Sequence, residues 1–284
     1  MTVPGLLFLY KRYLMSKIYR CALPLVLVAV AFLAAACSSA VCAVRGCYVV
    51  AHRGGASLAP ENSLSAIEKS IGFGADAVEI DVRLSADGAV VVFHDEKVDR
   101  KSNGSGFVRE LTLEELKLLR LLGPDGMLTD ERIPTLDEVL SCVAGRCNVL
   151  IEVKGDDARG IERAVVDAVR RHDAEGWVAV QAFSDAVLWR FVELGVSFPL
   201  EKLLVFKYPL VPYIYDGSSH RFSIDDYAHV SSFNIKKKYA RKGLVERFRS
   251  AGKDVKVWTL KKNDTSCPQG VTGVITDYPQ LFRP

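Results

Sequence analysis

Residues 76 to 82 read Asp-Ala-Val-Glu-Ile-Asp-Val, and residues 149 to 154 read Val-Leu-Ile-Glu-Val-Lys. Residues two apart on a strand point to the same face, so Glu79 lies beside Asp81, and the second run places a glutamate beside a lysine in the same way. The neighbouring residues are aliphatic, which indicates buried strands. Charged side chains are almost never buried without partners. The two runs therefore predict core strands whose charged pairs meet at one shared site, with each other or with a metal.

Strand-like runs of this kind alternate with helix-like runs along the chain. We expect eight strands: Tyr48–His52, Ala77–Val82, Asn148–Val153, Val178–Phe183, Leu203–Phe206, Val230–Asn234, Val255–Thr259 and Gly273–Thr276. Capping boxes at Thr112–Glu115 and Thr135–Glu138 mark two of the helix starts between them. Alternation favours a parallel sheet, and eight strands favour a closed (β/α)8 TIM barrel.

One strand-like run does not fit this alternation. Ala89–Phe93 follows Val82 after a short turn, whereas a parallel neighbour needs a crossover of about a dozen residues. We therefore predict a hairpin excursion after strand two, with its return arm carrying His94 over the barrel mouth. The segment Asn263–Gly270 is short and contains Pro268, which argues against a full helix before the last strand.

Short polar motifs recur beside these strands. In chain order they are His52-Arg53-Gly54, Pro60-Glu61-Asn62, Glu79-Ile80-Asp81, Asp87-Gly88, His94-Asp95, Ser102-Asn103-Gly104-Ser105-Gly106, Glu152-Val153-Lys154, Trp258-Thr259 and Thr276-Asp277-Tyr278-Pro279. With this order and content the chain resembles the glycerophosphodiester phosphodiesterase family over about residues 48 to 284. It departs from the family at Lys261, where an asparagine is common.

Three carboxylates are expected at the carboxyl ends of the strands, where barrel enzymes carry their active sites. Glu79, Asp81 and Glu152 would repel one another strongly in a partly dry cleft without a counter-ion. Oxygen ligands suit a hard divalent cation, so we predict one Mg²⁺ or Ca²⁺ rather than Zn²⁺. Arg53 and Lys154 are the candidates for holding the phosphate oxygens of a substrate.

The resemblance implies that His52 and His94 are the two catalytic residues. One would activate the nucleophile as general base and the other would protonate the leaving alkoxide as general acid, in an order left open here. Trp258 is expected to line the pocket for glycerol or the leaving alcohol. Glu61 is a further candidate contact for the metal or substrate, and Asn62 is expected to cap the helix that follows.

The reaction implied by the resemblance is hydrolysis of a glycerophosphodiester to sn-glycerol 3-phosphate and an alcohol. An alternative within enzymes is a lysophospholipase D or a phospholipase C-like lipid hydrolase. A second alternative is a surface lipoprotein whose main role is binding, although pure binding would not require two histidines and three carboxylates.

The amino-terminal region has the features of a bacterial lipoprotein signal. A short basic stretch precedes the uncharged apolar run Ala22–Ala36, which ends in small residues before Cys37. Cys37 is therefore the expected lipidation site, with residues 1–36 as signal peptide and the first 14 explained by an upstream start. An uncleaved membrane anchor is the rival reading.

We accordingly expect an exported protein held in the bacterial cell envelope by a lipid anchor. Residues 37–47 would form a short tether and residues 48–284 the catalytic domain. Four of the 37 basic residues and none of the 34 acidic ones precede Cys37. The remaining chain is thus almost neutral, which argues against a nucleic-acid partner. The partner that the resemblance implies is a small-molecule glycerophosphodiester.

The seven cysteines also fit an exported chain. Cys42 with Cys47, and Cys142 with Cys147, each enclose four residues and are expected to close small disulfide loops. Cys267 would then be the free cysteine.

Overall fold

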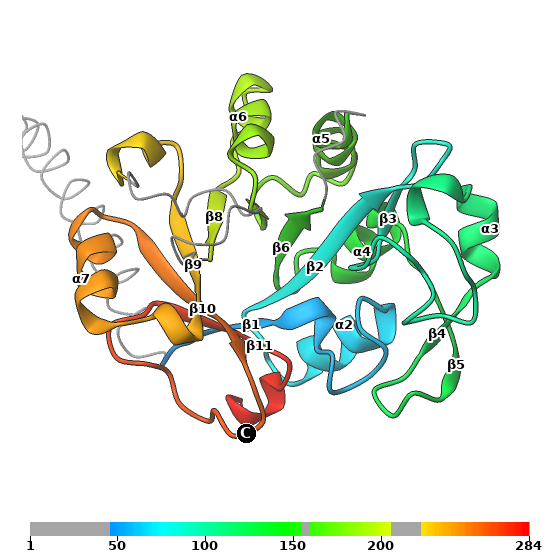
Figure 1. Cartoon of the computed structure of the whole chain (residues 1–284), viewed down its shortest axis with the longest axis horizontal. Helices are drawn as coiled ribbons and strands as arrows, with labels where there is room; N and C mark the ends of the chain where they lie inside the picture. The colour runs from blue at the N-terminus through cyan, green and yellow to red at the C-terminus, as the bar shows by residue number, and fades with distance from the viewer. Residues whose placement is uncertain (1–45, 155–159, 206–222, 284) are drawn as a thin grey trace, which may run out of the picture. The chain divides into compact units, whose positions relative to one another are not determined.

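Eight parallel strands form a closed barrel in the computed structural model, which describes residues 46–154, 160–205 and 223–283 (Figure 1). The strands are β1 (Tyr48–Ala51), β2 (Ala77–Leu84), β6 (Asn148–Val153), β7 (Val178–Ala182), β8 (Leu200–Leu204), β9 (Ser232–Lys236), β10 (Asp254–Leu260) and β11 (Gly273–Thr276). The barrel closes because β1 pairs in parallel with both β2 and β11. The predicted TIM barrel is confirmed.

Helices connect most of the strands and cover the outside of the barrel (Figure 1). They are α2 (Leu64–Gly72), α4 (Leu136–Val143), α5 (Ile161–Arg171), α6 (Asp185–Glu193) and α7 (Lys242–Ser250). Both predicted capping boxes are present, at Thr112 and Thr135. Among the described residues between β10 and β11 there is no helix, as the short segment containing Pro268 predicts.

The apolar core has two parts at the barrel. The larger lies between strands and helices, where aliphatic residues such as Ile80, Ile151 and Phe191 are fully buried. A small layer inside the barrel contains only Val50, Ala77, Leu150 and Ile275 as buried apolar residues. The barrel interior also holds buried polar and charged groups, including Glu79, Gln181 and Glu201, within the outer apolar shell.

Two expected strands are shifted in the structure. β8 spans Leu200–Leu204 where a strand was expected from Leu203, and β9 spans Ser232–Lys236 where a strand was expected over Val230–Asn234. Glu201 is buried because it pairs with Lys256, at 2.5 Å between Oε1 and Nζ. Buried partners therefore allow charged residues within strands, which pattern alone does not reveal.

The hairpin excursion is confirmed. β3 (Val90–Val92) runs antiparallel to the end of β2, which extends beyond Asp81 to Leu84 because of this pairing. The excursion continues through η2 (Val108–Glu110), α3 (Leu113–Leu118), β4 (Arg120–Leu122) and β5 (Leu128–Arg132). It has its own buried cluster, including Phe93, Leu116 and Ile133, and is therefore a packed lobe rather than a loose loop.

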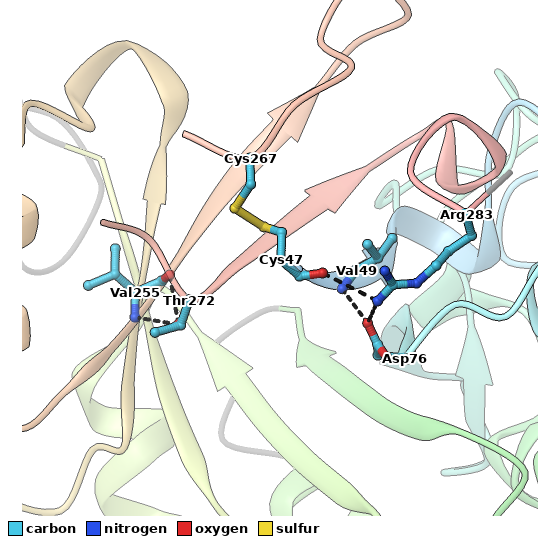
Figure 2. The surroundings of a disulfide bond; sticks show 7 residues. All are labelled: Cys47, Val49, Asp76, Val255, Cys267, Thr272 and Arg283. Atoms are coloured by element: carbon cyan, nitrogen blue, oxygen red, sulfur yellow. Dashed lines mark hydrogen bonds and ion pairs between the residues drawn. A yellow bond between two sulfur atoms is a disulfide. The ribbon is translucent and has the colours of Figure 1, made fainter. Parts of the chain in front are cut away.

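The expected disulfide pairing is wrong. Figure 2 shows Cys47 bonded to Cys267, while Cys142 and Cys147 are free thiols and Cys42 lies outside the described residues. Sequence spacing indicates only loops between neighbouring cysteines, whereas barrel closure brings the start of β1 to the segment before β11. The same end is held by Arg283, which forms an ion pair with Asp76.

The predicted leader, tether and lipidation site at Cys37 lie outside the described residues. Within the described residues, none of the helices is long and apolar enough to cross a membrane. Residues Cys47–Pro284 form one compact unit.

We predict that the Cys47–Cys267 bond contributes measurably to stability, because it crosslinks residues 220 positions apart in the unfolded chain. The double variant C47S/C267S should lose about 2–4 kcal/mol of unfolding free energy, measured by urea denaturation without reductant. The matched control C142S/C147S should change little. Four titratable thiols, rather than two, in denatured residues 47–284 would contradict the pairing.

Candidate active site

Three carboxylates meet at the carboxyl end of β2 and β6. One ligand oxygen from each of Glu79, Asp81 and Glu152 lies within 4.8 Å of the others, and all three side chains are buried. In-register pairing of Asp81 with Glu152 on adjacent strands brings the two pairs together, as the two-residue spacing predicts. The shared cluster is thus present as expected.

Glu79 and Asp81 accept hydrogen bonds from different neighbours. Glu79 accepts hydrogen bonds from the backbone N–H of Arg53 at 2.7 Å and from the Gln181 amide at 3.3 Å. Asp81 accepts one from the Asn62 amide at 2.9 Å, and Asn62 Oδ1 accepts the Asp81 backbone N–H at 3.1 Å. Asn62 therefore does not cap α2 as expected, since Ser63 does so.

Burial and mutual repulsion dominate the electrostatics of the cluster. Desolvation, followed by the charges of Asp81 and Glu152, raises the pKa of Glu79 well above its usual value. Burial also raises the pKa of Glu152, against the opposing effect of Lys154. The pKa of Asp81 is instead lowered, because Lys154, His94 and Arg53 outweigh its burial. Protein cations alone thus do not stabilise three ionised carboxylates at this site.

The donor set fits a divalent cation. Asp81 Oδ1 is buried and has no hydrogen-bond partner among the described residues. Lys154 Nζ lies 3.0 Å from it as the cation of an ion pair. Three carboxylate oxygens are ligands that suit Mg²⁺ or Ca²⁺. A bound cation would relieve the repulsion that raises the pKa of Glu79.

Arg53 and Lys154 both border the carboxylates. The guanidinium Nε of Arg53 lies 3.6 Å from Asp81 Oδ2, and this buried nitrogen has no hydrogen-bond partner. Arg53 NH1 donates to Glu61 at 2.8 Å, and Lys101 also pairs with Glu61 at 2.9 Å. The carboxylate of Glu61 therefore forms its ion pairs with these cations. The unmet donor of Arg53 leaves capacity for an anionic ligand.

His52 follows β1 and is oriented by Asp277, the residue directly after β11. Its Nδ1 lies 2.5 Å from Asp277 Oδ1, and the other oxygen of Asp277 lies 2.5 Å from Lys261 Nζ. These partners lower the pKa of Asp277 to about 2, although burial opposes the shift. Because Asp277 occupies Nδ1, Nε2 is the ring nitrogen that can exchange a proton with a substrate.

His94 is held in a parallel way at the end of β3. Its Nδ1 lies 2.7 Å from Asp95 Oδ1, and Asp95 also accepts two hydrogen bonds from Arg100. Arg83 on β2 donates twice to the His94 carbonyl, which fixes the backbone. Burial lowers the pKa of His94, and its charge in turn lowers the pKa of Asp81. The hairpin thus brings His94 near enough to Asp81 for the two side chains to interact electrostatically.

Trp258 lies half-buried at the same end of the barrel interior. Its indole Nε1 donates to the Asn234 carbonyl at 2.9 Å, and its ring meets the edge of Phe183 with centroids 5.7 Å apart. It packs against the apolar layer inside the barrel. The structure therefore places this aromatic side chain next to Phe183 and Asn234 inside the barrel.

Sequence reasoning did not assign a role to three residues that support this site. Asp277 orients His52, Gln181 contacts Glu79, and Asn234 continues from Gln181 with a 2.8 Å hydrogen bond. Asp277 belongs to the Thr-Asp-Tyr-Pro motif, which was a usable signal. Gln181 and Asn234 are single polar residues in apolar strands, and the inward face of each strand was the available signal.

Comparisons with known proteins agree with this geometry. The profile of the glycerophosphoryl diester phosphodiesterase family matches residues 52–281. The chain belongs to this family. A glycerophosphodiester phosphodiesterase from Caldanaerobacter subterraneus is 34% identical over 242 residues, covering 82% of this chain and 95% of that protein. One from Bacillus altitudinis is 31% identical, covering 81% and 94%.

Solved structures show the same family fold. The glycerophosphodiester phosphodiesterase of Agrobacterium tumefaciens has a TM-score of 0.69 and 28% identity, covering 84% of this chain and all of that one. A phosphodiesterase from Oleispira antarctica, solved with sn-glycerol 3-phosphate, has a TM-score of 0.70 and 24% identity, covering 84% and 96%. The chain is thus a phosphoric diester hydrolase of the glycerophosphodiester phosphodiesterase family.

We predict that Asp277 stabilises this phosphodiesterase in a pH-dependent way. Its folded pKa of about 2 lies below its usual 3.8, so its contribution is full above about pH 4 and is lost as the pH falls toward 2. D277N should lower the unfolding free energy by roughly 1–2 kcal/mol at pH 7, with a smaller difference at pH 3, measured by urea denaturation. The fully exposed Asp130 provides the control D130N. A difference in unfolding free energy between wild type and D277N that does not change with pH would contradict the prediction.

Proposed function

We propose that this enzyme hydrolyses glycerophosphodiesters to sn-glycerol 3-phosphate and an alcohol, using one divalent cation held by Glu79, Asp81 and Glu152. The observation that carries the proposal is the buried carboxylate cluster flanked by two basic side chains and two oriented histidines. Family membership supports the substrate class. When bound, the cation would supply Lewis-acid stabilisation of the charge that develops on the phosphate.

Arg53 and Lys154 would bind and orient the phosphate. Their pKa values are raised by the neighbouring carboxylates despite burial, so both stay cationic at neutral pH. Arg53 presents its unmet Nε donor toward this region, and Lys154 already lies between two carboxylates. Positioned charges of this kind act in a partly dry site, where they stabilise a phosphoryl transition state well.

His52 and His94 would carry the two proton transfers. Each has Nδ1 bound by an aspartate, Asp277 or Asp95, which fixes the ring and leaves Nε2 for the reaction. One removes a proton from the attacking oxygen, and the other gives a proton to the leaving alkoxide. Trp258 would line the pocket for one alcohol arm of the substrate.

The direct test is release of sn-glycerol 3-phosphate from a small panel of glycerophosphodiesters by purified residues 38–284. Chelation should abolish turnover, and Mg²⁺ or Ca²⁺ should restore it. E152Q should weaken both the rate and the apparent metal affinity, because it removes one of three ligand charges. Lysophosphatidylcholine assayed beside glycerophosphocholine separates the lipid-hydrolase alternative. Full activity after exhaustive chelation, or cleavage of the lysolipid alone, would overturn the proposal.

We predict that H52A and H94A each lower the rate about 10²- to 10⁴-fold, the usual contribution of a positioned acid or base. The wild-type pH profile should be bell-shaped, with each limb reporting an apparent pKa of the coupled site. Metal affinity and folding should be retained, since neither histidine is a proposed ligand. Near wild-type turnover of glycerophosphocholine by H94A would show that the hairpin histidine takes no part.

The leaving group separates the roles of the two histidines. A substrate with a nitrophenolate leaving group needs little protonation, so it should rescue only the variant that lacks the general acid. Equal rescue of H52A and H94A would contradict a division of labour between them.

We further propose that the mature enzyme is an exported lipoprotein, acylated at Cys37 and tethered to a membrane of the cell envelope. The leader pattern supports this, and so does the Cys47–Cys267 bond, because disulfides persist in oxidising compartments. C37S should abolish lipid attachment, seen as loss of the acyl mass, while the barrel retains its activity. Membrane-purified wild-type protein that begins upstream of Cys37 without an acyl group would exclude this.

A further inference from the structure

A strongly basic rim surrounds one side of the barrel mouth. It consists of seven cations between the end of β9 and the start of α7 and in the turn after β10: Lys236, Lys237, Lys238, Arg241, Lys242, Lys261 and Lys262. All seven side chains are exposed. Both segments follow the carboxyl ends of their strands, so the rim lies on the catalytic face.

The rim faces the carboxylate cluster across the barrel. Strands follow one another around the ring as β1, β2, β6, β7, β8, β9, β10 and β11. β9 is therefore opposite β2, and β10 is opposite β6, the two strands that carry the carboxylates. The rim and the carboxylates therefore border the same barrel mouth from opposite sides.

Lys236 connects the rim to the interior. It is two residues beyond Asn234, whose side chain bonds to Gln181 and Glu201 inside the barrel, and so it has the inward-facing register. Its ammonium lies 5.7 Å from the centroid of the Trp258 ring. The rim thus begins beside the proposed substrate pocket.

The charge of the rim is only partly balanced. Lys237 and Lys261 pair with Asp264 and Asp277, and Lys242 lies 3.8 Å from Glu246. Among the described residues, no ion pair is formed by Arg241 or Lys262. Local repulsion in this surface favours a bound anion.

The start of α7 adds to this imbalance. Arg241 is its N-cap, Lys242 is its first residue, and the first turn has no acidic residue. Cations at a helix N-terminus face the positive end of the helix dipole, so this arrangement does not stabilise the helix. Local conflicts of this kind are expected where a surface has a binding role.

We propose that this basic rim binds a second negatively charged group of the substrate, so that the enzyme prefers glycerophosphodiesters whose alcohol arm carries its own phosphate. This inference rests on the proposed hydrolytic function. The glycerol arm is uncharged, so an additional anion can reside only on the alcohol arm. The rim would attract this arm over the mouth and increase productive encounter with the carboxylate cluster.

The test uses a matched pair of substrates, glycerophosphoglycerol and glycerophosphoglycerol phosphate, which differ only in one terminal phosphate. Loss of each diester is followed by phosphorus NMR at fixed free Mg²⁺. Wild type should prefer the phosphorylated substrate about 10- to 100-fold in kcat/KM at low salt, mainly through KM. Salt at about 1 M, with a Debye length near 3 Å, should remove most of this preference.

The rim variant K236Q/R241Q/K262Q removes three cations, one or more from each segment. It should lose most of the preference while unfolding at the wild-type temperature. The control R170Q/R247Q/R249Q removes the same charge from the last turns of α5 and α7 and should keep the preference.

Equal kcat/KM for the two substrates in wild type, or a preference retained by the rim variant, would overturn the inference. Sedimentation of wild type but not the rim variant with anionic phospholipid vesicles, without substrate preference, would identify a membrane contact instead. Failure to hydrolyse either diester in the presence of Mg²⁺ or Ca²⁺ would instead contradict the proposed function.

Discussion

The rest of the structure depends on the burial of three carboxylates within 4.8 Å of one another. Like charges this close cannot all be ionised in a dry interior without compensation. The protein supplies part of it through Lys154 and Arg53, which lower the pKa of Asp81, whereas burial and the charges of Asp81 and Glu152 raise the pKa of Glu79. A divalent cation bound by the three carboxylates, as proposed above, would supply the remaining compensation.

The barrel makes this arrangement possible by holding a polar interior inside an apolar shell. Gln181 contacts Glu79, Asn234 contacts Gln181 and Glu201, and Glu201 pairs with Lys256. Hydrogen bonds therefore connect the carboxylate cluster, through Gln181, Asn234 and Glu201 on neighbouring strands, to Lys256 on β10. Satisfied networks of this kind rigidify a site, because each member loses a partner if another moves. Two aspartates outside this network, Asp277 and Asp95, give the histidines the same rigidity.

Much of this organisation can be predicted from sequence because it follows from periodicity. Alternation of strands and helices predicts the barrel, and the two-residue spacing predicts that Glu79, Asp81 and Glu152 converge. The exception is contact between distant segments. Cys47 pairs with Cys267, and His52 with Asp277, only because the last strand returns to the first. Charged strand residues such as Glu201 are likewise misread, since their partners lie on other strands.

The measurement that tests the central claim most directly is thermal unfolding of metal-free protein with increasing Mg²⁺ or Ca²⁺. A cation that binds only the native carboxylate cluster raises the unfolding free energy, and with it Tm, as its concentration increases. At 100 times Kd the gain in unfolding free energy is about 2.7 kcal/mol. The account predicts this rise for wild type and its loss in E79Q/D81N/E152Q. A wild-type Tm that does not respond to either cation, or an equal rise in the triple variant, would contradict it.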